Sequence, residues 1–196
     1  MLAEKRWAIL DVEFIRTSPS HRCIRKLYIL THNGFDMEME FHPCRSYQCL
    51  QLKYQRSYQF CRKHIHKLPY TPRRVSPSCR SSVPKLNEFV VNNDIDLILY
   101  KGGTIELELC NMLDIKSLNI ESMDVEKAYS HDPREEVNFY YNQLMNICNQ
   151  WYKCLFSCKI MSPSQFKAPT TMMHSSYPIP ASRLMNHLFF ALHSKF

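Results

Sequence analysis

The sequence predicts an α/β fold with a mixed sheet whose first three strands form an antiparallel meander. Two observations lead to this prediction. Three strand-like runs follow one another between residues 8 and 41, with a strong hairpin signal at Asn33-Gly34. Later in the chain, the apolar run Asp96–Lys101 ends in Gly102-Gly103 and is followed by a helical segment and a second short strand. Strand, helix and strand in that order form a crossover unit, so these two strands are expected to be parallel.

The opening strands are expected over Ala8–Ile15, Cys23–Thr31 and Phe35–Phe41. The first two are rich in aliphatic residues. In the third, Phe and Met alternate with Asp and Glu, which is the pattern of a strand with one buried and one solvated face. The Asn-Gly pair between the second and third runs favours a tight turn, so neighbouring strands of this group are expected to be antiparallel.

Two helices are expected between the meander and the crossover unit. Residues 46–68 place tyrosines and aliphatic side chains three or four positions apart, and Leu68-Pro69 ends that pattern. Residues 71–83 are rich in Pro, Ser and Arg and are interpreted as a loop. Val83–Asn92 then has the apolar spacing of a short helix.

The last elements are a helix over Thr104–Leu113, a strand over Ser117–Ile120 and a final helix with good start chemistry. In that helix Asp132 suits the N-cap, Pro133 suits the first position, and Glu135 completes a capping box. Its buried face is expected at Val137, Tyr140, Tyr141, Leu144 and Cys148.

The character of the chain changes near residue 152. No acidic residue follows Glu136, and residues 161–181 contain four prolines among Ser, Thr and Met. We therefore expect one domain over 1–151 and a poorly ordered C-terminal extension over 152–196. The apolar patch Leu184–Leu192 is either a docking helix or part of an extension with no fold of its own.

Composition limits the classes of protein to which the chain can belong. The N-terminus is too short in apolar residues for a secretory signal, and no apolar stretch approaches the length of a membrane span. The nine cysteines lack paired spacing. Reduced thiols and a cytoplasmic or nuclear location are therefore expected, with no membrane partner.

The net charge of +7 is concentrated in one segment. Between Glu40 and Glu88 there is no acidic residue, while ten Lys and Arg residues are interleaved with aromatic ones. Such a block is suited to binding the phosphates of nucleic acid; a solubilising face or a disordered basic loop are the alternatives. The candidate nucleic-acid-binding residues are Arg56, Arg62, Lys63, Lys67, Arg73, Arg74 and, outside the block, Lys101.

Asp11 and Glu13 are the most informative pair of residues in the sequence. Side chains two positions apart on a strand point to the same face, so both carboxylates share one side of the first strand. Adjacent carboxylates repel each other and lose hydration on burial unless a cation lies between them, and a divalent metal is the usual cation. An edge strand with one wet face is the alternative.

The order of elements and motifs resembles the ribonuclease H-like fold, and within it the DEDDh class of 3′–5′ exonucleases, over about residues 5–150. Asp11-x-Glu13 matches the first motif of that class. Lys101-Gly102-Gly103-Thr104-Ile105-Glu106 lies where the class has His-Asn-Ala-x-Phe-Asp, which gives Glu106 the second acidic position. The third motif corresponds to His131 and Glu136. The resemblance implies a central mixed sheet with helices on both faces.

The resemblance also implies hydrolysis of phosphodiesters in single-stranded DNA or RNA. Asp11, Glu13, Glu106 and Glu136 would hold two Mg²⁺ or Mn²⁺ ions, and His131 would accept a proton from the attacking water. The sequence departs from the family pattern because Glu replaces Asp at positions 106 and 136, so each carboxylate lies one C–C bond (about 1.5 Å) farther from its backbone.

Three alternatives stay open. A catalytically inactive relative would use the basic block to bind RNA or DNA. A protein-interaction domain would use the C-terminal extension. The Maelstrom family resembles the same fold and carries a zinc site, for which Cys and His ligands are available here, but their spacings fit no compact ligand set, so free or buried thiols are expected. These candidate zinc ligands are Cys61, His64, Cys148, Cys154 and Cys158.

Overall fold

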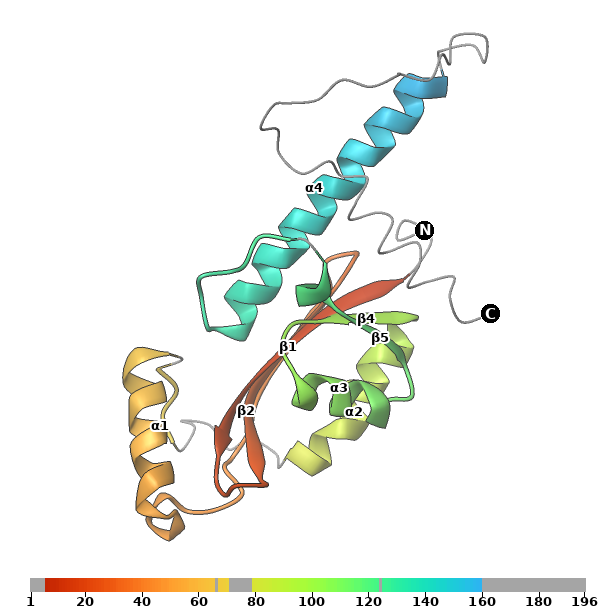
Figure 1. Cartoon of the computed structure of the whole chain (residues 1–196). Helices are drawn as coiled ribbons and strands as arrows, with labels where there is room; N and C mark the ends of the chain where they lie inside the picture. The colour runs from red at the N-terminus through yellow and green to blue at the C-terminus, as the bar shows by residue number, and fades with distance from the viewer. Residues whose placement is uncertain (1–5, 66, 71–78, 124, 160–196) are drawn as a thin grey trace.

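The computed structural model describes residues 6–65, 67–70, 79–123 and 125–159 (Figure 1). It confirms a mixed α/β architecture. In chain order the elements are β1 (Trp7–Arg16), β2 (Arg22–Thr31), β3 (Asp36–Glu40), a 3₁₀ helix (Tyr47–Cys49), α1 (Leu52–His64), α2 (Cys79–Asn92), β4 (Leu97–Tyr100), α3 (Thr104–Met112), β5 (Lys116–Asn119), another 3₁₀ helix (Ile120–Ser122) and α4 (Pro133–Lys159).

The sheet has five strands in the order β3-β2-β1-β4-β5. β1, β2 and β3 pair antiparallel, which confirms the predicted meander. β4 is parallel to both β1 and β5, which confirms the predicted crossover unit. β1 therefore lies at the centre of the sheet, with an antiparallel neighbour on one side and a parallel neighbour on the other.

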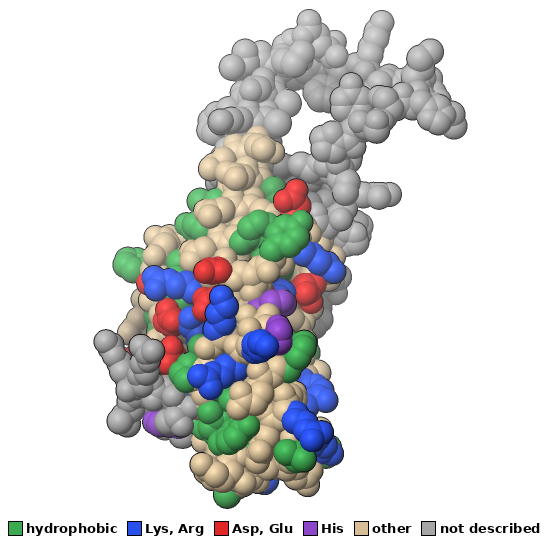
Figure 2. Space-filling view, turned by 90° about the vertical axis from the view of Figure 1, so that its left-hand side faces the viewer, with side chains coloured by type: hydrophobic (Ala, Val, Ile, Leu, Met, Phe, Trp, Pro, Cys, Tyr) green, Lys and Arg blue, Asp and Glu red, His purple; other side chains and the backbone are tan. Residues whose placement is uncertain are grey.

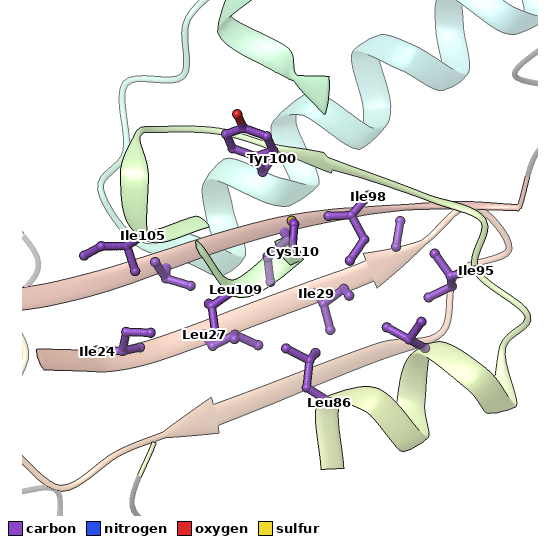
Figure 3. Close-up of a cluster of buried hydrophobic side chains, with 14 of the residues drawn as sticks. Ile24, Leu27, Ile29, Leu86, Ile95, Ile98, Tyr100, Ile105, Leu109 and Cys110 are labelled. Carbon is purple, nitrogen blue, oxygen red and sulfur yellow. The ribbon is translucent and has the colours of Figure 1, made fainter. Parts of the chain in front are cut away.

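Apolar side chains cover both faces of the sheet. On one face, Leu10 and Ile98 pack with Leu86 of α2 and Leu109 of α3 (Figure 3). On the other face, a second cluster packs against α4. Its members are Trp7, Ile9, Tyr28, Leu30, Leu97, Leu99, Ile120, Met123, Val137, Tyr140 and Leu144. The alternation of β1 between these clusters fixes which of its side chains meet α4.

Two predicted elements differ from the structure. The helix expected over 46–68 is a 3₁₀ turn followed by α1, because Leu50 adopts extended backbone between them. The loop expected over 71–83 is wrong at its end, since α2 begins at Cys79 and contains Pro84. Pro84 is the sixth residue of α2 and therefore removes one intrahelical hydrogen bond without ending the helix. Residues 71–78 lie outside the described residues.

The segment around the edge strand β3 differs from the predicted alternation in one side chain. Phe41 is buried and the two methionines of the strand are partly buried, but Phe35 is 59% exposed. Phe35 precedes β3 and belongs to the turn, where its carbonyl oxygen accepts hydrogen bonds from the Thr31 backbone and hydroxyl. The predicted alternation therefore holds from Asp36 to Phe41 and fails at Phe35.

α4 begins as its sequence predicts. Asp132 Oδ1 accepts a hydrogen bond from the Arg134 N–H at 2.9 Å, which makes it the N-cap. The capping box takes a different form, because Glu135 accepts from Ser130 Oγ, and Ser130 Oγ accepts in turn from the Asp132 N–H. Of the predicted buried face, Tyr141 and Cys148 are partly buried and the other three residues are buried.

α4 continues to Lys159, past the boundary expected at residue 151. The rest of the predicted extension, including Leu184–Leu192, lies outside the described residues. In the part of the chain that the structure describes, no helix is both long and apolar enough to cross a membrane.

Candidate functional site

The candidate site is a group of acidic side chains between β1 and α4. Asp11 and Glu13 follow Trp7 and Ile9 along β1, on the face covered by α4. Asp11 is only 6% exposed. A β-bulge after Glu13 shifts the pairing with β2, so that Ile15 joins a separate cluster with Cys23 and Tyr58. The bulge thus ends the acidic face of β1 at Glu13.

Glu136 and Lys101 form the central ion pair of this group. Lys101 follows β4, and its backbone N–H donates to the Leu10 carbonyl beside Asp11. Its Nζ lies 2.5 Å from Glu136 Oε2, and the Glu136 side chain is 2% exposed. Burial raises the pKa values of Asp11 and Glu13, and the Lys101 ammonium partly opposes this rise. The cation among these acids is therefore a side chain of the protein itself.

Glu106 reaches the group from the first turn of α3. Its Oε2 accepts a hydrogen bond from the Gly103 N–H at 3.0 Å. Gly102 makes room for this carboxylate, since a Cβ there would lie 2.9 Å from Glu106 Oε1, and its φ of +116° also favours glycine. The Gly-Gly pair therefore holds Glu106 at the helix start, where the helix dipole favours a negative charge.

His131 and Asp132 complete the surroundings at the start of α4. His131 Nδ1 lies 3.8 Å from Glu136 Oε1, and its side chain is 57% exposed. Asp132 binds Lys26 Nζ at 2.7 Å, and Lys26 lies directly opposite Glu13 in the β1–β2 pair. The predicted base therefore lies next to the last predicted acid, at the entrance of the group.

Burial dominates the electrostatics of these acids. It raises the pKa of Asp11 well above its usual value, and the Glu136 carboxylate raises that pKa further. Burial and the same carboxylate raise the pKa of Glu13 to about 7. Burial also raises the pKa values of Glu106 and Glu136, although the Gly103 N–H and Lys101 respectively oppose this rise. The group therefore favours bound protons or an added cation.

The arrangement does not fit a divalent ion held by the four acids. Among the described residues, no three Asp, Glu, His or Cys side chains are placed to hold a metal ion. Glu106 points to a backbone N–H and Glu136 to Lys101. The metal and catalytic roles of Asp11, Glu13, Glu106, His131 and Glu136 stay predictions.

The described cysteines and the histidine considered for zinc also belong to no group that could hold a metal ion. Cys61 and Cys148 are free thiols in the described structure. Cys154 and Cys158 lie beyond residue 150, the last whose side chain is described.

The basic face lies on α1, next to the acidic group. Arg56, Arg62, Lys63 and Lys67 are exposed, and the lower part of Figure 2 shows Lys and Arg, with no acidic side chain among the described residues. Tyr58 of α1 packs with Ile15 of β1, so α1 lies against the strand that carries Asp11 and Glu13. The other predicted cations are Arg73 and Arg74, which lie outside the described residues, and Lys101, which pairs with Glu136.

The sequence reasoning missed two basic residues of β2. Lys26 links Glu38 of β3 to Asp132, with its Nζ 2.9 Å and 2.7 Å from the two carboxylates. Arg25 is 3% exposed. Two consecutive cations inside the otherwise apolar run of β2 were the available signal, because a buried charge needs a partner.

Comparison with known proteins gives little further information. No protein-family model and no curated protein match the chain. Among solved structures, it is similar to the family B DNA polymerase from the hyperthermophilic archaeon Pyrobaculum calidifontis, with 18% identity and a TM-score of 0.29. The match covers 57% of this chain and 11% of that protein, so it concerns a small part of the polymerase. A TM-score this low assigns neither a fold family nor a function.

Proposed function

We propose that this chain is a nucleic-acid-binding domain of ribonuclease H-like fold, in which Lys101 balances the charge of a nuclease-like carboxylate group. The observation that carries the proposal is the cationic face of α1 beside that group. Between Glu40 and Glu88 the chain has no acid that could neutralise this face internally. Its exposed cations are therefore available to phosphates, and each neutralised phosphate releases a counterion.

The placement of the acids supports the proposed fold. β1 is the central strand, and it carries Asp11 and Glu13 on the α4 face. Glu106 lies at the start of α3, and Glu136 lies in the first turn of α4. These are the positions that the resemblance to the exonuclease class implies for its four acids.

Lys101 supports a binding role rather than hydrolysis in this arrangement. An ammonium 2.5 Å from Glu136 supplies the positive charge that buried acids otherwise take from bound protons or an ion. The residue is also part of the chain, so this charge does not depend on metal concentration. A single-stranded nucleic acid bound along α1 would lie beside the acids without being cleaved.

Binding of a fluorescently labelled single-stranded oligonucleotide, measured by anisotropy at several salt concentrations, tests the proposal. The double variant Arg62→Ala/Lys63→Ala should weaken binding and reduce the slope of log K against log salt by about 0.7 for each phosphate that the variant no longer neutralises. Lys85→Ala/Lys127→Ala is the matched control, because it also removes two exposed cations but from α2 and the segment before α4. Equal effects of the two double variants would contradict the proposed surface.

Metal-dependent hydrolysis of phosphodiesters is the second candidate. It is favoured by the excess of buried acid over cation, since one lysine faces Asp11, Glu13, Glu106 and Glu136. Degradation of single-stranded DNA and RNA with Mn²⁺ separates the candidates when wild type, Asp11→Ala and the exposed control Glu108→Ala are compared. Activity that only Asp11→Ala abolishes would establish hydrolysis. Salt-sensitive binding without degradation supports the binding role.

A further inference from the structure

A pocket of about 430 Å³ lies between α1 and the segment that follows β3. This volume is within the range of about 300–1,000 Å³ found for small-ligand sites. Among the described residues, none of those that line it is acidic. The basic and aromatic lining residues are His42, Arg45, Arg62, Tyr47, Tyr58 and Tyr70.

Three tyrosines form one wall of the pocket. The ring centroids of Tyr47 and Tyr70 are 5.2 Å apart, and those of Tyr58 and Tyr70 are 5.0 Å apart, both in edge-to-face geometry. Tyr58 is 3% exposed, whereas Tyr47 and Tyr70 are partly exposed. The wall therefore has a buried base and two rings that a ligand can reach.

Hydrogen bonds hold these rings in place before any ligand binds. The Tyr58 hydroxyl donates to the Leu68 carbonyl at 2.9 Å, and the Tyr70 hydroxyl donates to the Arg45 carbonyl at 2.6 Å. Gln59 donates to the Tyr47 hydroxyl at 3.0 Å. A rigid aromatic wall loses little entropy on binding, which favours a flat ligand that stacks on it.

A buried cation lies behind this wall. Arg25 is 3% exposed, and its guanidinium carbon is 5.8 Å from the centroid of the Tyr70 ring. Its Nε donates to the Phe41 carbonyl and its Nη2 to the Pro69 carbonyl. Its Nη1 has no hydrogen-bond acceptor among the described residues. Arg25 does not itself line the pocket, so it supports the Tyr70 ring from behind.

The β-bulge explains the position of Arg25. Glu13 pairs with Lys26 and Phe14 pairs with Ile24, so Arg25 is the unpaired residue of β2. A bulge redirects side chains locally. Arg25 thereby lies beside Tyr70. Its neighbour Lys26 forms an ion pair with Asp132 at the start of α4.

We propose that this pocket binds one nucleotide of a single-stranded nucleic acid, with the phosphate at Arg45 and Arg62 and the base against Tyr47 and Tyr70. This inference rests on the proposed function. Arg45 and Arg62 are exposed and form no ion pair with the described residues, so both guanidinium groups are available for charge-assisted hydrogen bonds to phosphate. Stacking on aromatic rings tolerates every base, which matches a site with no acid to read base edges.

Nucleotide binding by the full chain tests the pocket directly. In calorimetry at low salt, AMP should bind about tenfold more tightly than ribose 5-phosphate, because only AMP carries a base that stacks on the tyrosines. Tyr47→Phe should keep this ratio, and Tyr47→Ala should remove most of it. Similar affinities of AMP, ribose 5-phosphate and inorganic phosphate in the wild type would overturn the proposal, since they indicate an anion site without base recognition.

Oligonucleotide binding separates failure of the pocket from failure of the proposed function. Arg62→Ala should weaken binding about tenfold, whereas Arg56→Ala, an exposed α1 arginine that does not line the pocket, should weaken it about twofold. Equal losses, together with no AMP binding, would overturn the pocket while leaving nucleic-acid binding intact. AMP binding without oligonucleotide binding would overturn both, and would leave a site for free nucleotides.

Discussion

The buried acids of this protein stand out because the chain as a whole is strongly basic. Its net charge is +7, yet Asp11, Glu106 and Glu136 are each at most 6% exposed. Their main counter-charge is Lys101, which is bonded to Glu136. At the scale of single residues, folding therefore brings together groups that repel each other, and the stability of the protein depends on their protonation.

Replacement of Glu13 by Gln should change how stability depends on pH. The pKa of Glu13 is about 7 in the folded protein, compared with an ordinary value of 4.5. The folded state thus binds more protons than the unfolded state, so stability falls as pH rises from about 4.5 to 7. Glu13→Gln should raise the free energy of unfolding at pH 8 by about 1–3 kcal/mol and change it little at pH 4.

Urea unfolding of wild type and Glu13→Gln at several pH values measures this effect. Glu108→Gln is the control, because it removes a carboxylate from an exposed position on α3. If Glu13→Gln changed the free energy of unfolding equally at pH 8 and at pH 4, burial of the Glu13 charge would not be the cause.

Replacement of Lys101 should have the opposite dependence on pH. Lys101→Met leaves Glu136 and Asp11 without their cation, which should lower the free energy of unfolding by about 1–3 kcal/mol at pH 8. At pH 5 the loss should be smaller, because these acids have raised pKa values and become protonated. Lys101→Arg keeps the charge and should be milder. A loss that is the same at both pH values would indicate packing rather than charge.

The sequence could predict on which elements the acids lie, but not how they are neutralised. Asp11 and Glu13 are fixed by strand alternation, and Glu106 and Glu136 by the starts of their helices. The direction of Lys101 depends on where β4 ends relative to α4, which no local pattern encodes. Arg25 depends on the bulge in β2, and a shift of register by one residue cannot be read from side-chain alternation.

At the scale of elements, the turn between β4 and α3 controls the position of Glu106. Gly102 has a φ of +116° and lies against the Glu106 carboxylate, whereas a Cβ at Gly103 would meet no atom within 4 Å. The carboxylate in turn accepts from the Gly103 N–H. The Gly102-Gly103 loop and the first turn of α3 therefore stabilise each other.

Gly102→Ala and Gly103→Ala form a matched pair that tests this turn. Gly102→Ala should lower the free energy of unfolding by about 1–3 kcal/mol, because alanine is strained at positive φ and its Cβ meets the carboxylate. Gly103→Ala should cost less, since its site is open. Thermal or urea unfolding measures both. Equal losses would show that the approach of Glu106 to Gly102 does not matter.

Long, regular elements were predictable because their patterns repeat. The strands β1, β2 and β4 are apolar runs, and the start of α4 has an N-cap and a proline in the expected places. The segment before α1 was not predictable in detail. There, Tyr47 faces the pocket and packs on other tyrosines, so its position depends on tertiary contacts rather than on helical spacing.

At the scale of the whole molecule, the two candidate binding features use different ends of the same pair of strands. The acids lie on β1 under α4, and the tyrosine wall lies beyond the bulge beside α1. Figure 1 shows α1 beside the lower end of the β1–β2 pair and α4 as a separate helix higher in the view. A single-stranded nucleic acid that occupies both regions would therefore run along β1.

Truncation after Lys159 should leave oligonucleotide affinity within about twofold of the full chain, because the α1 face, the pocket and the acids all precede that residue. Anisotropy with the same labelled oligonucleotide measures this. A large loss of affinity would instead favour the alternative in which the C-terminal segment carries the interaction.

The short edge strand β3 has a consequence for how copies of this protein meet. Within the described structure, one side of β3 has no neighbouring strand, and its Asp36 and Glu40 are exposed. A second copy that added its own β3 there would bring like charges together on adjacent strands, which is unfavourable. The charges of this edge therefore oppose growth of a continuous sheet between molecules.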